Sequence, residues 1–353
     1  KITGLGERRE MRLFDCDRLE SETWDSGIVS FVAQIHEYKG RQALFLKEPE
    51  AVLRRMEETA GLQSVEASNR IERIGTTRTQ LKRLLAGETL PRNRDEEALL
   101  GYRNATRLLN DQDPDVPFTP GLILQLHQEV MKLTGVTDAG RYKTVPNVVS
   151  GVLRSGERVT VFEPLAPSDT PDAMASLCAA YQAAIRKGAV DELILIPCFI
   201  LNFLCVHPFR DGNGRVSRLL TRLLLERQGE AGSRYVSLEK TIADTAESYY
   251  AALRKSDQGW KEGENDPRPF IRYLLAVILA GYRDWESRFE SGAGRRVTAY
   301  SLVKRFAADR LGAFSKQDVL EACPRIAGSS AEASLKRLVD ERYLFRIGAG
   351  RVT

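Results

Sequence analysis

The segment from His207 to Arg218 gathers residue types that suit chemistry on a phosphate group. One apolar run (Leu193 to Val206) precedes it and another (Val216 to Leu225) follows, so the pattern predicts a loop between two buried helices. Gly212 and Gly214 open the second helix, where glycine lets the backbone approach a ligand and turn its N–H groups toward it. The N-terminus of that helix adds a positive dipole end, which favours phosphate.

Four side chains of this segment have a chemical use. His207 can take a proton near neutral pH. Asp211 offers a hard oxygen to Mg²⁺, which normally takes one or two carboxylates plus phosphate and water. Arg215 and Arg218 are three residues apart, so they face one side of the first helical turn, where they can hold phosphate oxygens. Each feature alone is common in structural roles, and their combination at one unbroken spacing favours a phosphate-handling site.

The sequence of residues 207–218, HPFRDGNGRVSR, resembles the Fic family motif, HPFx[DE]GNGRxxR, at every defined position. A later stretch, from Gln258 to Pro267 and followed by a long helical pattern, is also similar to sequences of that family. The resemblance covers about residues 45–353. It implies a mostly α fold, in which a Fic-type helical core carries a β-hairpin flap and a C-terminal winged helix-turn-helix domain follows.

The resemblance implies a protein adenylyltransferase, which transfers AMP from ATP to a Ser, Thr or Tyr hydroxyl of a target protein. His207 would be the general base that deprotonates this hydroxyl. Asp211 would hold Mg²⁺ against the α- and β-phosphates. Gly212, Asn213 and Gly214 would form a cradle for the anion.

Further site residues follow from the same resemblance. Arg215 and Arg218 would position the phosphates, with Arg218 toward the γ end, and Phe209 would point into the core and anchor the loop. Tyr249 and Tyr250 would line the adenine pocket. Doc-like relatives, which transfer the γ-phosphate, lack the second glycine and the distal arginine. Gly214 and Arg218 therefore favour AMP transfer.

A second short motif lies upstream. Residues 68–72, SNRIE, are similar to the [ST]xxxE[GN] inhibitory motif of Fic proteins that have an N-terminal autoinhibitory helix. By this resemblance Ser68 and Glu72 form a brake, because Glu72 would pair with Arg218 and occupy the place that a γ-phosphate needs. Arg73 stands where the family prefers Gly or Asn, which is unfavourable if this position must adopt a positive φ.

Periodicity gives the remaining elements. Residues 140–165 alternate and contain β-branched residues, which predicts a hairpin ending in a loop at 164–167. This flap, about Thr144 to Ser150, would pair with an extended target segment by strand addition, with Thr144, Pro146, Asn147 and Val148 at the contact. Apolar residues at helical spacing predict a helix opened by Pro49 and further helices near 94–111, 119–133, 168–187, 190–206, 213–228, 241–255 and 267–290.

The composition changes after Gly292 and Gly294, which suggests four parts: an N-terminal arm (1–45), a helical region with the inhibitory helix (46–112), the Fic catalytic core (113–291) and a winged helix (296–353). Basic residues in the last part suit DNA phosphates, but acidic ones interleave with them, so a protein-contact or homodimer role fits equally. The basic residues are Lys336, Arg337, Arg342, Arg346 and Arg351, and the acidic ones are Glu332, Asp340 and Glu341.

Composition sets broad limits. The 353 residues exceed one typical domain, and 52 basic against 48 acidic residues give little support to nucleic-acid binding. Five cysteines without a CxxC pattern argue against a disulfide framework and for a reducing compartment. No secretory pattern is visible at the start, and the longest apolar stretch is too short to span a bilayer. We therefore expect a cytoplasmic protein that is not embedded in a membrane.

Rival hypotheses stay open at this point. The chain could remove AMP from a modified protein, with Glu72 orienting the water. It could be a DNA-binding regulator whose Fic core only senses nucleotide. Transfer of UMP or of a phosphocholine group is a third option, because the loop grips phosphates and not bases. The target protein is unidentified, and self-modification is expected alongside transfer to it.

Overall fold

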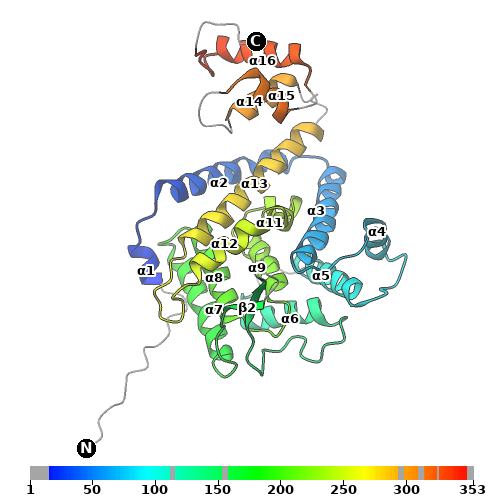
Figure 1. Ribbon diagram of the computed structural model, residues 1–353, viewed down its shortest axis with the longest axis vertical. Coiled ribbons are helices and arrows are strands. Elements are labelled where there is room, and N and C mark those ends of the chain that lie inside the picture. The colour runs from blue at the N-terminus through cyan, green and yellow to red at the C-terminus, as the bar shows by residue number, and fades with distance from the viewer. Residues whose placement is uncertain are drawn as a thin grey trace, which may run out of the picture. The chain divides into compact units, whose positions relative to one another are not determined.

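The computed structural model describes residues 16–111, 116–152, 158–292, 298–308, 314–323 and 326–347. The contacts divide the chain into two compact units, residues 1–285 and 286–353. The helices that begin in the first unit are α1 (Cys16–Ser21), α2 (Ser26–Phe45), α3 (Glu50–Ile71), α4 (Arg78–Ala86), α5 (Arg94–Asn110), α6 (Pro120–Met131), α7 (Thr170–Lys187), α8 (Glu192–Val206), α9 (Asn213–Arg227), α10 (Gly232–Tyr235), α11 (Leu238–Asp244), α12 (Ala246–Ser256) and α13 (Arg268–Gly292), drawn in Figure 1.

Local signals in the sequence set several helix ends. The side chains of Thr77, Asn93 and Asp191 accept hydrogen bonds from backbone N–H groups at the starts of α4, α5 and α8. These bonds satisfy donors that have no partner within the helix. Gly188 adopts φ +64° after the last turn of α7, as expected for a helix stop. The predicted helices of the core are confirmed to within two or three residues at most ends.

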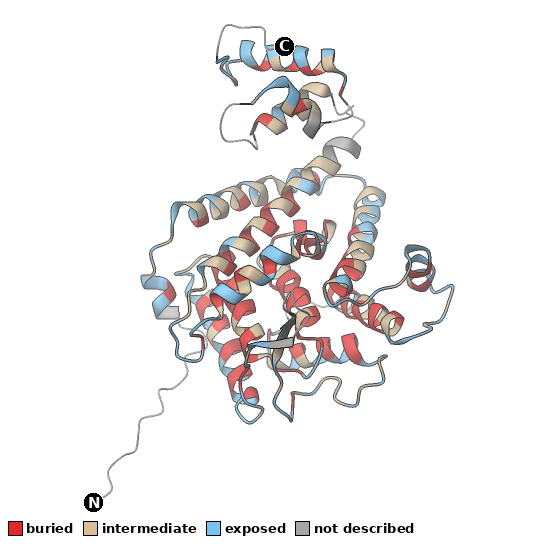
Figure 2. Cartoon of the chain, viewed as in Figure 1, coloured by how far each residue is buried: buried red, intermediate tan, exposed pale blue. Residues whose placement is uncertain are grey.

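The core of the first unit is built on α8 and α9. Most residues of both helices are buried, and α8 packs between α7 and α9 while α9 also contacts α3, α5 and α6. Figure 2 shows the buried residues concentrated on these central helices. The loop between α8 and α9 is therefore held at both ends by the most deeply buried elements.

The helices differ from the sequence-based expectation in several places. Residues 16–45, expected as an arm, form α1 and α2, with Ile28 and Ile35 fully buried. The helix α4 was not expected. The single helix expected over 241–255 is two helices that meet at Thr245, whose hydroxyl donates to the Thr241 carbonyl. A threonine that bonds its own backbone in this way competes with a continuous helix.

The expected hairpin is present but short. Strands β1 (Val149–Val152) and β2 (Arg158–Phe162) pair antiparallel, with a register irregularity between Val149 and Ser150. Residues 142–148, which alternate in the sequence, do not form a strand. They instead run against the loop that follows α8, as the next section describes.

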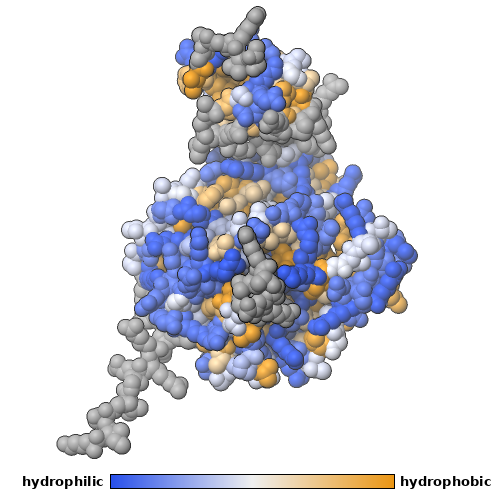
Figure 3. Space-filling model, viewed as in Figure 1, coloured by the Kyte–Doolittle hydropathy of each residue, from blue (hydrophilic) through white to orange (hydrophobic). Residues whose placement is uncertain are grey.

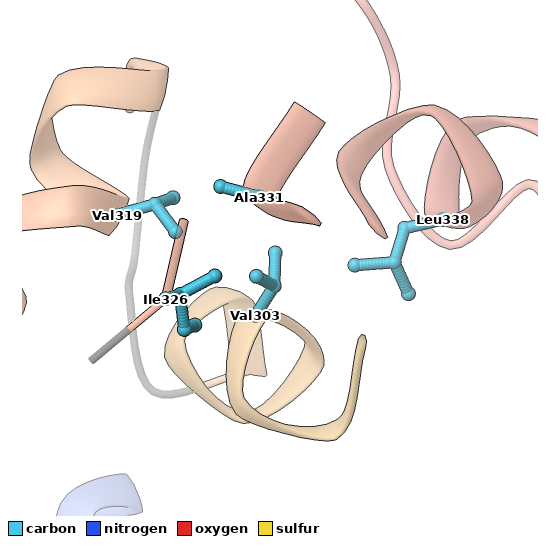
Figure 4. Close-up of a cluster of buried hydrophobic side chains, with 5 residues drawn as sticks. All are labelled: Val303, Val319, Ile326, Ala331 and Leu338. Carbon is cyan, nitrogen blue, oxygen red and sulfur yellow. The ribbon is translucent and has the colours of Figure 1, made fainter. Parts of the chain in front are cut away.

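The second unit contains α14 (Ala299–Ala308), α15 (Lys316–Ala322) and α16 (Gly328–Asp340). A small cluster joins the three helices, and Figure 4 shows its members Val303, Val319, Ile326, Ala331 and Leu338. Ser315 and Asp318 form a reciprocal capping box at the start of α15. Residues 341–347 form no strand, and the tail expected as a wing continues into residues 348–353, which include Arg351 and lie outside the described ranges.

The basic residues that could meet DNA phosphates differ in their contacts with acidic neighbours. Lys336, Arg342 and Arg346 are exposed. Arg337 is bound to Glu341, with Nε 2.8 Å from a carboxylate oxygen. The acidic neighbours thus offset part of the basic surface, in line with the mixed charge of the sequence.

The surface is ordinary for a globular protein. Figure 3 shows that the face of the first unit turned toward the viewer is mainly hydrophilic, with apolar atoms in smaller patches.

None of the helices in the described ranges is both long enough and apolar enough to cross a membrane. Cys178, Cys198 and Cys205 are buried and form no disulfide.

Candidate active site

The loop between α8 and α9 presents an imidazole to a cavity. His207 ends α8 in the left-handed conformation, at φ 49° and ψ 60°. Its Nδ1 lies 3.2 Å from the Leu204 carbonyl oxygen, so Nδ1 donates its proton there and Nε2 keeps a free lone pair. Burial lowers the pKa of His207 to about 4. The ring is therefore neutral at pH 7, which is the state that can accept a proton.

Two hydrogen bonds between the Asn213 side-chain amide and the Phe209 backbone fix the middle of the loop. The Phe209 N–H donates to Asn213 Oδ1 at 2.9 Å, and Asn213 Nδ2 donates back to the Phe209 carbonyl at 2.7 Å. Phe209 is fully buried, as expected of an anchor. The Asn213 side chain, expected in the anion cradle, is thus occupied in holding the loop, and only its backbone can face a ligand.

His127 of α6 is a support that the sequence did not reveal. Its ring stacks on Phe209 with 3.7 Å between centroids and 4° between planes. Nδ1 accepts from the Gly140 N–H at 3.0 Å, which leaves Nε2 to donate to the Asp211 carbonyl at 3.1 Å. Burial lowers the pKa of His127 to about 4, so the neutral ring keeps this donor and acceptor arrangement at pH 7. A lone histidine within an apolar helix gave no signal for this role.

Asp211 is the accessible carboxylate of the loop. Its side chain is half exposed, lines the same cavity as His207, and has Oδ1 3.3 Å from Arg215 Nη2. Oδ2 lies 3.7 Å from Arg94 Nη2, at the start of α5. One accessible carboxylate beside an anion cradle fits Mg²⁺, which takes its other ligands from phosphate and water. Arg94 would have to release Oδ2, and the sequence gave no sign of this partner.

Two glycines shape the cradle at the start of α9. Gly212 has φ +85°, a conformation that side chains rarely adopt. A Cβ added to Gly214 would lie 2.3 Å from Glu72 Oε1. The Glu72 carboxylate therefore rests against the cradle itself, at the positive end of the α9 dipole.

Ser68 and Glu72, of the segment expected to be inhibitory, both contact Arg218. Glu72 Oε1 accepts from Arg218 Nη2 at 2.8 Å, while the Ser68 hydroxyl and carbonyl oxygens accept from Arg218 Nε and Nη2 at 2.8 and 2.9 Å. Arg218 is only 4% exposed. Burial alone would lower the pKa of Arg218, but the adjacent Glu72 charge raises it. The pair is therefore a charge-assisted, largely desolvated contact.

Arg73 follows Glu72 in the left-handed region, at φ 61°. This conformation costs a residue with a Cβ roughly 1–2 kcal/mol relative to glycine. The position where the family prefers Gly or Asn thus has a positive φ in this chain, although an arginine occupies it.

Arg215 does not share the environment of Arg218. It is buried, does not line the cavity, and places Nη2 3.3 Å from both Asp211 Oδ1 and Met131 Sδ. Its Nε and Nη1 have no hydrogen-bond partner among the described residues. In this conformation Arg218 lines the cavity and Arg215 does not, because α9 is buried and these two side chains contact different neighbours.

A cavity of about 660 Å³ joins these elements, a size typical of sites for small organic ligands. Tyr249 and Tyr250 of α12 line it, with ring centroids 5.2 Å apart in an edge-to-face arrangement. Leu201, Leu204 and Leu253 add an apolar wall. Asp257, which the sequence did not single out, also lines it, and burial raises its pKa to about 6. The cavity thus combines a polar end at the loop with an aromatic and apolar end.

The flap residues divide into two groups. Thr144, Pro146 and Val148 are exposed, as docking to a target would need. Asn147 is not free, because Nδ2 donates to the Phe209 carbonyl at 2.9 Å. Of the flap hairpin, Val149, Val161 and Phe162 reach the cavity wall. The flap is thus continuous with both the cavity and the loop.

A helical core that presents this loop beside a two-stranded hairpin defines the Fic fold. The Fic/DOC family model matches residues 117–225, the part of the chain that contains this loop. The solved structure of a Fic family protein from Desulfovibrio desulfuricans G20 agrees with a TM-score of 0.62 at 25% identity over 91% of each chain. A fragment of Fic-1 from C. elegans shares the fold, with a TM-score of 0.61 at 21% identity over 75% of this chain and 73% of that chain.

Curated relatives name an activity. This chain is 26% identical over 270 residues to "Protein adenylyltransferase fic-1" of Caenorhabditis briggsae, a match that covers 74% of this chain. It covers 48% of the relative, so the chain spans about half the length of that protein.

Proposed function

We propose that this chain is a protein adenylyltransferase, which moves AMP from ATP to a Ser, Thr or Tyr hydroxyl of a target protein. The single observation that carries the proposal is the arrangement of His207. Its Nε2 lone pair belongs to a neutral ring in the cavity that also holds Asp211 and the glycine-rich start of α9. The curated relatives named adenylyltransferases support the same assignment.

The reaction balances with the groups present. The target hydroxyl oxygen attacks the α-phosphorus of ATP, its proton passes to Nε2 of His207, and the bond to the departing pyrophosphate breaks. The N–H groups at the start of α9 would stabilise charge on the phosphates, so catalysis would come mainly from positioning and electrostatics. Asp211 would hold Mg²⁺, which when bound supplies positive charge to the phosphates.

Glu72 gives the proposed enzyme a brake. Its carboxylate lies against Gly214 and is bound to Arg218, so a negatively charged γ-phosphate could not share this position. ATP would then bind with its α-phosphorus away from His207. The adenine would lie toward Tyr249 and Tyr250.

Incubation with ATP labelled at the α-phosphorus, Mg²⁺ and a cell extract tests the proposal. Label should join a protein, either a target or the chain itself, and should be lost with His207→Ala. Absence of protein-bound label in every condition, including with Glu72→Gly, would contradict it. Release of AMP from a modified protein that requires Glu72 would assign the reverse chemistry instead.

A further inference from the structure

Lys143 and Asn147, on the segment that leads from α6 into β1, bind the backbone of the catalytic loop. Lys143 is only 3% exposed, and its Nζ donates to the Val206 carbonyl at 3.0 Å and to Asn147 Oδ1 at 2.9 Å. Its backbone N–H donates to the Pro208 carbonyl at 2.9 Å. One residue thus contacts the loop on both sides of His207.

Asn147 completes the set of contacts. Its Nδ2 donates to the Phe209 carbonyl at 2.9 Å and reaches the His207 carbonyl at 3.4 Å. Each carbonyl from Val206 to Phe209 therefore has a donor from Lys143 or Asn147. The last carbonyls of a helix have no partner within it, so the lysine and asparagine supply what the end of α8 lacks.

This arrangement is costly for the fold. Among the described residues no carboxylate pairs with the Lys143 ammonium, and burial, with a contribution from Lys261, lowers its pKa to about 8. A buried cation whose partners are neutral oxygens loses hydration free energy, which these partners restore only in part. The negative end of the α8 dipole offsets part of that cost. Groups with such perturbed pKa values cluster at functional sites, which points to a role for Lys143 beyond stability.

The consequence falls on His207. This residue holds a left-handed backbone conformation that costs a non-glycine residue free energy and persists only where its surroundings impose it. The orientation of the ring, with Nδ1 on the Leu204 carbonyl, depends on that backbone. Contacts on the carbonyls that flank His207 are the surroundings that impose it.

We propose that Lys143 and Asn147 are positioning residues, which clamp the loop so that Nε2 of His207 faces the cavity. The kinetic part of this proposal rests on the proposed adenylyl transfer. The same segment carries the exposed Thr144, Pro146 and Val148. The clamp would therefore also set the distance between a docked target hydroxyl and the base.

Kinetics in a Glu72→Gly background test the clamp. Lys143→Met should lower kcat by about 100-fold, the loss typical of a reacting group displaced by about 1 Å, while KM for ATP changes less than about twofold. Asn147→Ala should act in the same direction, and Lys143→Arg, which keeps a charged donor, should recover most of the loss. Lys132→Met is the matched control, because Lys132 is exposed and pairs with Glu129. A kcat for Lys143→Met within about twofold of the parent would overturn the proposal.

The ring nitrogens give a readout that does not need activity. The chain has three histidines, so ¹H–¹⁵N correlation spectra of the imidazoles can be assigned with His207→Ala. In the parent, His207 should show a protonated Nδ1 and an unprotonated Nε2. Lys143→Met should give averaged tautomers. An unchanged His207 spectrum in Lys143→Met would overturn the clamp, whereas a changed spectrum without any AMP transfer in the parent would overturn only the proposed function.

Discussion

Glu72 Oε1 lies 2.8 Å from Arg218 Nη2, and the same oxygen occupies the space beside Gly214 where α9 begins. The motif on α3 and the motif on α9 are 146 residues apart in the chain, yet one carboxylate joins them. In the proposed function, a terminal phosphate of ATP would need the part of the cradle that this contact fills. We therefore expect the chain to be held in a low-activity state by its own helix.

Removing the carboxylate should release this state. Glu72→Gly frees Arg218 and the Gly214 edge of the cradle, and we expect AMP incorporation from labelled ATP to rise at least tenfold, the change given by about 1.4 kcal/mol. The measurement is the initial rate of protein labelling at fixed ATP and Mg²⁺. Glu66→Gly is a suitable control, because Glu66 lies on the same helix but outside the cavity lining. A rate for Glu72→Gly at or below that of the parent would refute the brake.

The backbone strain at Arg73 makes an opposite prediction. Arg73→Gly removes the left-handed penalty of roughly 1–2 kcal/mol from the state in which Glu72 binds Arg218. The inhibited state should become more stable, so basal labelling should fall about five- to thirtyfold. Arg342 has φ 59° in the second unit and is the matched control. Its replacement by glycine relieves the same kind of strain but should leave the labelling rate unchanged, and equal effects of both changes would count against the argument.

Arg94 should compete with Mg²⁺ for the Asp211 carboxylate, and a titration with Mg²⁺ can measure this competition. Arg94→Ala removes a partner 3.7 Å from Asp211 Oδ2. Both side chains are more than half exposed, so the pair contributes no more than about 1 kcal/mol. The Mg²⁺ concentration for half-maximal labelling should fall by up to about fivefold, while Arg107→Ala, at the other end of α5, should leave it unchanged. A rise with Arg94→Ala would show that this arginine assists the site instead.

The buried histidines link stability to pH. The folded pKa values of His127 and His207 are about 4, below the ordinary value of 6.5. At these two histidines the unfolded chain binds more protons between about pH 4 and 6.5, so their contribution to stability falls as the pH drops through this window, by about 1.4 kcal/mol per pH unit for each. The raised pKa of Asp257, about 6, acts in the opposite direction below that pH. Urea unfolding of His127→Gln and the parent from pH 7 to pH 4.5 isolates one histidine: the slope of the variant should be lower by about 1.4 kcal/mol per pH unit, and an unchanged slope would contradict the assignment.

The sequence predicted the parts of the site whose residues are contiguous in the chain or belong to a known motif. Residues 207–218 form one loop and one helix start, so their spacing alone places His207, Asp211 and the glycines together. The partner of Arg218 was predicted from the inhibitory motif. The bounds of α8 followed from a nearly continuous apolar run, and those of α9 from apolar residues at helical spacing, with a cap or a glycine at the ends.

The supports of the loop could not be predicted, because they depend on contacts between distant segments. Lys143 contacts Val206 across 63 residues, and His127 contacts Asp211 across 84. Their residue types are ordinary, and no local spacing distinguishes them from surface or core residues. The orientation of Arg215 was also hidden, since two residues three apart share a helix face only approximately, and a fully buried helix divides that face between different neighbours.

Position-specific labelling tests the central claim most directly. Glu72→Gly is incubated with Mg²⁺ and with ATP carrying its label at either the α- or the γ-phosphorus, beside Glu72→Gly combined with His207→Ala. We predict protein-bound label from α-labelled ATP, none from γ-labelled ATP, and none from either when His207 is replaced. Label transferred from the γ-position, or equal α-labelling without His207, would contradict the account.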